Sequence, residues 1–249
     1  MLDKMPVRLR REPLIEVVWE IRFSGSESSV ADLLPGMIFR ALPGRFSSVV
    51  RLPVADIPAP IVEHDPGLRY APKLRLEKDN RAVLIGEHVV SLSCRRPYPG
   101  WAQFSKEIRE LASVVKDTGL VPSLERCSIK YVDLIQLQEP IGIDCLNLVL
   151  RLGQYSIVST PIQLRTEVIE ENLVHIIQIV SPAEVTVLGE DESFKGVLLD
   201  IDTVRSLNGE RSWDTLYAEL DTMHLAAKRM FFSLLTSDTL NKLDPEYAG

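Results

Sequence analysis

The four histidines are the first residues to test for chemistry, because imidazole serves both as a general base and as a metal ligand. They are His64, His88, His175 and His224. None stands in an HxH or HExxH motif, and no neighbouring cysteine completes a metal-binding set. Asp221 precedes His224 by three residues on an expected helix and would orient its ring as a general base is oriented. Alternatively, His224 packs at the edge of a helix–sheet core, which is the commoner situation for such a residue.

Paired carboxylates are the second group whose spacing permits catalysis. Glu167, Glu170 and Glu171 lie close together in the sequence, and Asp200 and Asp202 are two residues apart on an expected strand. Two such aspartates share one face, as coordination of a hard cation requires, although the same alternation predicts an exposed polar face. No GxxxxGK[ST], GxGxxG or GxSxG motif and no Cys/His nucleophile signature occurs. The sequence therefore predicts no catalytic residue, no metal and no cofactor, and favours a protein that is not an enzyme.

Five basic residues form the candidate binding site. Arg69, Lys73 and Arg75 alternate along one segment, and Arg95 and Arg96 follow on another. If their strands adjoin, these side chains would create an anion-binding face. The alternative is a solvated sheet edge, because acidic residues are interspersed among them.

Charge is unevenly distributed along the 249 residues. The first 120 residues contain 18 Lys and Arg against 15 Asp and Glu, whereas the remainder contains 10 against 20. The net charge of −7 makes the whole chain a poor non-specific binder of nucleic acid or anionic membranes. No apolar run is long enough to span a membrane, no secretory signal is apparent, and the three cysteines form no CxxC pair. We therefore expect a cytoplasmic protein with reduced cysteines.

Hydrophobic periodicity predicts both strands and helices. Residues 101–115 and 213–235 carry apolar stripes at helical spacing, and shorter helices are expected at 30–41, with a break near Pro35, and at 145–152. Alternating or β-branched segments predict strands at 14–23, 47–52, 73–77, 82–94, 126–137, 163–168, 173–180 and 196–204.

The order of these elements repeats along the chain. Each half contains a strand, a helix, several strands and then a helix that begins with Trp101 or Trp213. This order predicts an α+β fold of two similar halves, residues 1–120 and 121–249, each an antiparallel sheet packed against a long helix. In element order alone it resembles the duplicated saddle of TATA-binding-protein-like and related helix-grip folds, and a fold does not define a function.

Short motifs spread over nearly the whole chain carry a family resemblance. They are Pro13-Leu14-x-Glu16 in the first strand, Gly100-Trp101-x-x-Phe104, Arg126-x-x-x-Lys130-Tyr131-x-Asp133, and His224-x-x-Ala227-x-x-x-Phe231. With these the chain resembles a sporadically distributed prokaryotic family of uncharacterised proteins of similar length, in which Arg-Tyr-x-Asn is commoner at the third motif. The resemblance implies no settled activity, and the patchy distribution is similar to that of mobile stress or antiviral-defence genes.

Three functions are compatible with these observations. The first is a non-catalytic protein-binding, adaptor or regulatory subunit, in an antiviral-defence or stress locus, that contacts a protein partner through a sheet face or the acidic half. The alternative is a nucleic-acid or nucleotide-binding protein that uses the basic half. A metal-dependent hydrolase or nuclease built on Glu167, Asp200, Asp202 or His224 is the third.

Overall fold

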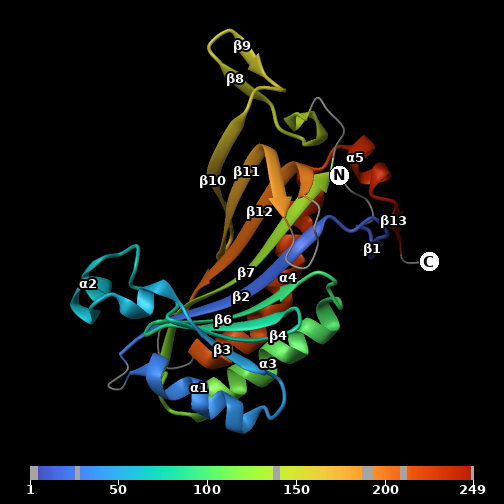
Figure 1. Cartoon of the computed structure of the whole chain (residues 1–249). Helices are drawn as coiled ribbons and strands as arrows, with labels where there is room; N and C mark the ends of the chain where they lie inside the picture. Colours follow the sequence, from blue (N-terminus) through green and yellow to red (C-terminus); the bar gives the residue numbers. More distant parts are fainter. Residues whose placement is uncertain (1–4, 26–28, 137–140, 187–192, 208–211, 248–249) are drawn as a thin grey trace. The chain divides into compact units, whose positions relative to one another are not determined.

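A computed structural model of the chain describes residues 5–25, 29–136, 141–186, 193–207 and 212–247 (Figure 1). Contacts between residues divide the chain into two compact units. Unit 1 contains Met1–Ile15, Lys130–Thr203 and Leu225–Gly249, and unit 2 contains Glu16–Ile129 and Val204–His224. Each unit therefore combines residues from both sides of position 120.

A nine-stranded antiparallel sheet provides most of the secondary structure. Its strand order is β10-β11-β12-β7-β2-β6-β5-β4-β3, so β10 and β3 are the edge strands. Two small sheets, β1-β13 and β8-β9, are separate from it. The strands are β1 (Arg8–Leu9), β2 (Leu14–Ser24), β3 (Ser48–Arg51), β4 (Leu74–Lys78), β5 (Arg81–Ile85), β6 (Val89–Arg95), β7 (Ser123–Gln136), β8 (Leu150–Leu152), β9 (Tyr155–Ile157), β10 (Ile162–Glu170), β11 (Leu173–Thr186), β12 (Ser193–Ser206) and β13 (Pro245–Glu246).

Two of the helices are long. They are α3 (Trp101–Asp117) and α4 (Ser212–Leu234), and they accompany α1 (Val30–Ala41), α2 (Ala59–His64), α5 (Ser237–Lys242) and the short 3-10 helices η1 (Pro53–Asp56) and η2 (Ile143–Cys145). Within the described ranges, none of these helices combines the length and apolar character needed to cross a membrane.

The predicted duplication is wrong. Strands occupy 42% of the chain and helices 31%, and the strands of both sequence halves join one sheet instead of forming two sheets that each carry a long helix. Helix α4 contributes residues to both units, so it does not belong to one half of a repeat. Strand pairing over long sequence distances, which the order of elements does not determine, sets the architecture.

Individual elements were predicted more accurately. The strand at 14–23, the helices at 101–115 and 213–235, and the hairpin at 163–180 are confirmed as β2, α3, α4 and β10–β11. The helix at 30–41 is also present, but it continues through Pro35. The expected helix at 145–152 is wrong, since η2 ends at Cys145 and β8 begins at Leu150.

Unit 1 is stabilised by one apolar cluster. Strands β11 and β12 alternate buried side chains that face the end of α4. This alternation gives each strand one buried face. A one-residue shift in the strand pairing would turn that face away from the helix, so the alternation fixes the register of the strands. The buried members include Ile177, Ile179, Val197, Leu199, Ile201, Phe231, Phe232 and Leu235.

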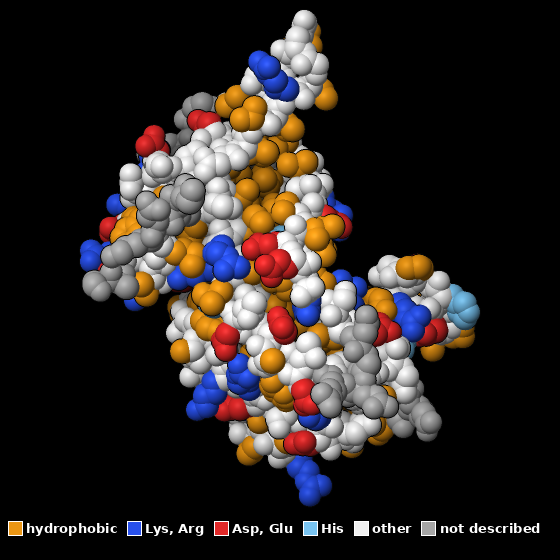
Figure 2. Space-filling view, turned by 180° about the vertical axis from the view of Figure 1, so that it is seen from behind, with side chains coloured by type: hydrophobic (Ala, Val, Ile, Leu, Met, Phe, Trp, Pro, Cys, Tyr) orange, Lys and Arg blue, Asp and Glu red, His pale blue; other side chains and the backbone are white. Residues whose placement is uncertain are grey.

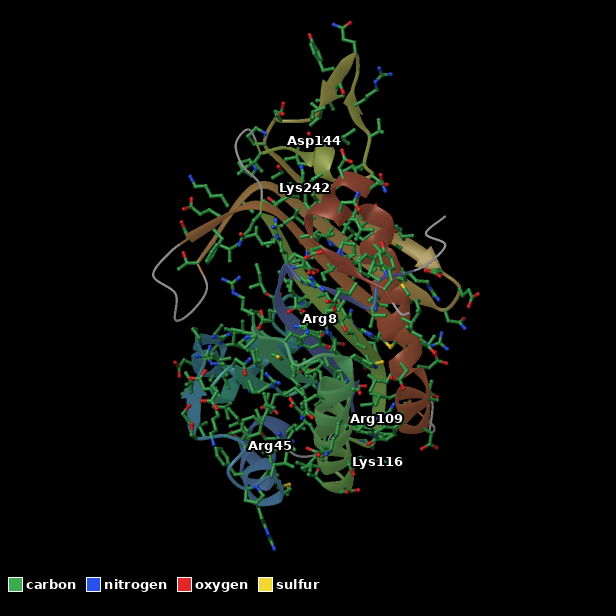
Figure 3. The ribbon with its side chains drawn as sticks, turned by 90° about the vertical axis from the view of Figure 1, so that its right-hand side faces the viewer. Arg8, Arg45, Arg109, Lys116, Asp144 and Lys242 are labelled. Atoms are coloured by element: carbon green, nitrogen blue, oxygen red, sulfur yellow. The ribbon has the colours of Figure 1, made fainter. Side chains whose placement is uncertain are left out.

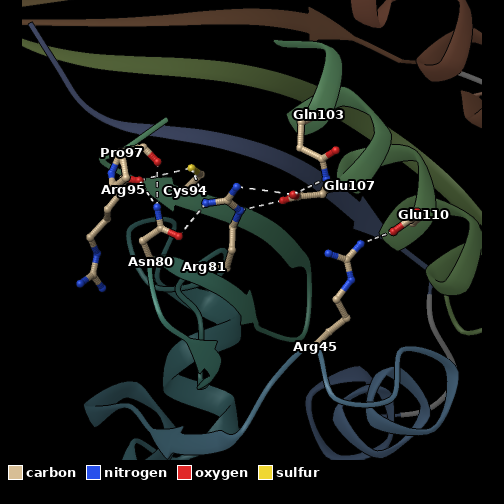
Figure 4. A network of polar contacts seen from close by, with 9 residues as sticks. All are labelled: Arg45, Asn80, Arg81, Cys94, Arg95, Pro97, Gln103, Glu107 and Glu110. Atoms are coloured by element: carbon tan, nitrogen blue, oxygen red, sulfur yellow. Dashed lines mark hydrogen bonds and ion pairs between the residues drawn. The ribbon is translucent and has the colours of Figure 1, made fainter. Parts of the chain in front are cut away.

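Unit 2 contains a buried ion pair between a helix and the sheet. Arg81 Nε of β5 lies 2.7 Å from Glu107 Oε2 of α3, with side chains only 20% and 9% exposed (Figure 4). Gln103 donates to Glu107 at 2.9 Å, and Arg81 also donates to Asn80 at 2.8 Å. Burial raises the pKa of Glu107, but the hydrogen bonds from Arg81 and Gln103 and the charge of Arg81 outweigh it, so the pKa lies below its ordinary value. Arg45 pairs with Glu110 one turn further along α3.

Substitution of Glu107 by Ala should lower the free energy of unfolding by about 3 kcal/mol, because it leaves the buried Arg81 guanidinium without its counter-charge. Urea denaturation measures this loss. The pKa of Glu107 is depressed, so its contribution is present above the unfolded-state pKa and is lost as the pH falls through the folded-state pKa.

The matched control is Glu110→Ala on the same helix, whose ion pair with Arg45 is more exposed. It should cost less than about 1 kcal/mol. Equal losses for the two variants at neutral pH would contradict the importance assigned to the buried pair.

Candidate functional site

Two of the five predicted basic residues form ion pairs at β4 of unit 2, Lys73 just before the strand and Arg75 within it. Lys73 Nζ is 2.8 Å from Glu87 Oε1, and both side chains are three-quarters or more buried. Arg75 Nε is 2.8 Å from Glu77 Oε2, a neighbour two residues along the same face of β4. A phosphate at either position would have to displace a carboxylate, so these charges attract an external anion weakly.

Arg69 belongs to a second group of opposed charges in unit 2. Its guanidinium lies 3.5 Å from Glu63 Oε1 and 5.9 Å from the centre of the Tyr70 ring. Glu63 also contacts His88 Nε2 at 2.8 Å. The hydrogen bond from His88 is the main cause that lowers the pKa of Glu63, with smaller contributions from nearby positive charges. This arrangement keeps a negative charge beside Arg69.

Arg95 and Arg96 lie at the end of β6. Arg95 stands opposite Glu16 in the β2–β6 ladder, and its backbone carbonyl accepts a hydrogen bond from Asn80 at 2.7 Å. Figure 4 shows its side chain directed away from the Arg81–Glu107 ion pair. Arg96 is half-buried, immediately before Pro97.

The predicted His224–Asp221 pair lies where α4 meets α3 in unit 2. The His224 ring is stacked on Trp101, with ring centres 4.2 Å apart and planes 5° from parallel. Asp221 accepts hydrogen bonds from Trp101 Nε1 at 2.7 Å and from Arg109 at 3.1 Å. Figure 3 shows Arg109 on α3 beside α4, and Lys116 further along α3. Lys116 Nζ lies 3.6 Å from Asp214 Oδ1 of α4. These contacts link α3 to α4, because Trp101 and Arg109 of α3 both donate hydrogen bonds to Asp221 of α4.

A buried histidine network in unit 1 was not predicted. His175 of β11 is fully buried, with Nδ1 2.9 Å from Thr203 Oγ1 of β12 and Nε2 3.3 Å from Glu170 Oε2. Arg229 of α4 lies 3.4 Å from the other oxygen of Glu170. Because Thr203 is also fully buried, the row of side chains positions the end of the β10–β11 hairpin.

Both members of the predicted aspartate pair are largely buried, since the Asp200 side chain is 15% exposed and Asp202 is 9% exposed, so the exposed polar face that the alternation also predicted is not observed. Asp200 contacts Lys130 Nζ at 3.6 Å and Gln178 Nε2 at 3.3 Å. Burial raises the pKa of Asp200, the charge of Lys130 opposes this, and that of Asp202 adds to it. Glu167 lies elsewhere, on β10. In the described ranges no three His, Cys, Asp or Glu side chains lie close enough together to hold a metal ion.

A third carboxyl in unit 1 is more strongly perturbed. Asp133 of β7 is 5% exposed, and its burial raises its pKa to about 8, with further contributions from the charges of Glu12 and Asp200. The charged form of Asp133 is therefore disfavoured in the folded protein near neutral pH. The strand predicted at 126–137 includes Asp133, but its pattern does not predict the raised pKa.

The β8–β9 hairpin carries strongly exposed apolar side chains, with Val149 at its base. Val149 is 87%, Leu152 73% and Tyr155 66% exposed, and Val158 follows at 42%. Figure 2 shows apolar side chains on the projecting hairpin and in a band below it. The helix predicted at 145–152 would have buried part of this group, so the sequence pattern does not indicate its exposure. We call residues 149–158 the apolar arm.

Comparison with known proteins gives no further assignment. No family model matches the chain, and no curated protein matches it. The resemblance to the prokaryotic family therefore stays a prediction.

Substitution of Asp133 by Asn should stabilise the protein increasingly as the pH rises. The folded-state pKa of about 8 exceeds the unfolded value of about 3.9, so the folded state binds the extra proton and wild-type stability falls with rising pH between these values. An amide carries no charge to bury. We expect the variant and the wild type to have nearly the same free energy of unfolding near about pH 4, and the variant to be more stable by about 1–3 kcal/mol near about pH 8.

Thermal denaturation at a series of pH values measures this change. Asp144→Asn, which alters an exposed carboxylate of the same unit, is the control and should leave the slope with pH as in the wild type. A parallel pH dependence for Asp133→Asn and the wild type would disprove the assigned environment.

Proposed function

We propose that the protein is a non-catalytic subunit that binds a protein partner through its apolar arm, in an adaptor or regulatory capacity. The observation that carries the proposal is the exposure of Val149, Leu152 and Tyr155 together on one short hairpin. Clustered exposed apolar side chains mark interaction surfaces, and tyrosine is enriched among the residues that dominate binding energy.

The base of the arm is fixed to the rest of unit 1. Ile143 N donates to Val158 O at 2.9 Å, and Asn147 donates from its side chain to the carbonyls of Ser233 and Leu235 at 3.0 and 2.8 Å. A two-stranded hairpin is only marginally stable by itself. Anchoring it at the end of α4 reduces the entropy that a partner must overcome when it binds the exposed residues.

The alternative of nucleic-acid binding by the basic half receives less support. Arg69, Lys73 and Arg75 each have a carboxylate within 3.5 Å. Nucleic-acid binding gains its strength when basic side chains neutralise phosphates and release the counterions condensed on them, and a basic group already paired with a carboxylate contributes less. A hydrolase built on Glu167, Asp200, Asp202 or His224 remains the third candidate.

The biological setting is also part of the proposal. We place the protein in the cytoplasm and in an antiviral-defence or stress locus, the latter on the family resemblance alone. The three cysteines are buried and none forms a disulfide, which agrees with a reducing compartment.

The proposal is tested by capture of the tagged full-length chain from native lysate, followed by mass spectrometry. The wild type should recover a nuclease-resistant, stoichiometric partner. The triple variant Val149→Ser, Leu152→Ser, Tyr155→Ser should bind that partner about tenfold or more weakly and recover correspondingly less of it, because truncation of central apolar contacts costs at least ~1.4 kcal/mol of binding free energy.

The control is Ile61→Ser, which removes an apolar side chain that is 54% exposed in unit 2. It should retain the partner. A partner that is equally recovered with the triple variant would refute binding through the arm, and recovery of nucleic acid in place of protein would favour the alternative.

A further inference from the structure

Strand β10 forms one edge of the nine-stranded sheet, and no strand among the described residues pairs with its outer side. Strand β10 pairs with β11 over nine residues, from Ile162 to Glu170, and is the last strand in the sheet order. Five consecutive residues of it, 165–169, are exposed, including Ile169 at 76%. The other edge strand, β3, has only four residues. A long edge strand offers its outward backbone groups to another strand.

The sequence of β10 is self-complementary about Thr166. When two copies pair antiparallel with Thr166 opposite Thr166, all nine residues overlap, and Arg165 of each copy faces Glu167 of the other. Within one chain these two side chains already lie on the same face, with Arg165 Nη2 3.0 Å from Glu167 Oε1. Pairing would therefore form a ladder of four alternating charges, with opposite charges directly across the strands.

The other face of β10 is complementary as well. In the same register Leu164 lies opposite Val168 of the second copy. Both residues belong to the face that β10 shares with the core, since they pair with Ile179 and His175 of β11. Val168 is 39% exposed and Leu164 is partly buried at the margin of the apolar cluster. A second strand would cover this margin, although the terminal pairs, such as Ile162 with Glu170, are mixed.

Neighbouring registers are disfavoured. Opposed residues of an antiparallel pair share a face, so symmetric pairing in a continuous sheet must centre on a residue. Centring on position 165 places Arg165 opposite Arg165, and centring on 167 places Glu167 opposite Glu167. Like charges directly opposite are destabilising. The register about Thr166 is thus the longest and avoids both repulsions.

We propose that the β10 edge binds β10 of a second copy of this chain, in an antiparallel two-fold pair centred on Thr166. The interface is isologous, because each copy contributes the same surface. The inference is independent of the apolar arm and of the partner assigned to it.

Charge reversal tests the register directly. Arg165→Glu places a glutamate opposite Glu167 of the second copy, and Glu167→Arg places an arginine opposite Arg165. Sedimentation velocity of the full chain over a concentration series should show a dimer for the wild type and weakening of about tenfold or more for each variant. The double variant Arg165→Glu, Glu167→Arg should restore the dimer.

Mixing the two single variants gives the decisive comparison. One then carries two glutamates and the other two arginines on β10, so together they should form a mixed dimer that neither forms alone. Both side chains are at least half exposed, and unchanged circular dichroism and Tm exclude a loss of folding. The control Arg51→Glu, which reverses an exposed ion pair with Asp56, should dimerise as the wild type does.

Three results would overturn the inference. The first is a wild-type chain that stays monomeric at a protein concentration of about 100 µM, which would mean a dissociation constant weaker than that value. The second is a dimer whose dissociation constant does not change with either charge reversal. The third is a mixture of the single variants that stays monomeric. The apolar-arm triple variant should remain dimeric, so a lost protein partner and a lost dimer are distinguishable.

Discussion

Backbone hydrogen bonding across one open antiparallel sheet is the constraint on which the other features depend. Every strand N–H and C=O needs a partner, and an open sheet satisfies this requirement everywhere except at its two edges. The interior strand β2 shows the result, since its residues from Val17 to Phe23 alternate fully buried apolar side chains with half-buried ones. At β3 the sheet ends in a strand of four residues with Pro53 shortly after it. At β10 it ends in nine residues, so the two edges differ in what they offer another chain.

The same geometry explains the electrostatics. Residues two apart on a strand share a face, and this chain repeatedly places an arginine and a glutamate at that spacing. The pairs are Glu20–Arg22, Arg75–Glu77 and Arg165–Glu167, with nitrogen–oxygen distances of 2.7, 2.8 and 3.0 Å. In β2 and β4, which have neighbours on both sides, such a pair neutralises a basic residue within the molecule. In β10 the outer side has no neighbouring strand among the described residues, so the pair also defines a template for a second chain.

The extent of prediction from sequence follows from the range of each interaction. Strand β2, helices α3 and α4 and the β10–β11 hairpin were predictable because their patterns are read over neighbouring residues. The predicted duplication is wrong because the order of strands in the sheet depends on pairings between distant segments, such as β7 beside β2. The candidate site depends on the same long-range contacts: Asp221 accepts hydrogen bonds from Trp101 and Arg109, more than 100 residues earlier, and the sequence pattern around His224 does not predict either partner. The apolar arm gave no signal, since Val149 and Leu152 look the same in a buried helix and in an exposed hairpin.

The composition of β10 also bears on how far association at this edge proceeds. An exposed strand that contains Val168 and Ile169 would be an aggregation hazard, but its charges permit few registers. Glu170 is further held by His175 and Arg229, which fixes the end of the strand. Once two copies pair about a two-fold axis, both β10 edges are used, and among the described residues the nine-stranded sheet of each copy is left with its four-residue β3 edge. Because an isologous contact consumes the surface that forms it, association at β10 closes at two chains and does not propagate into a fibre.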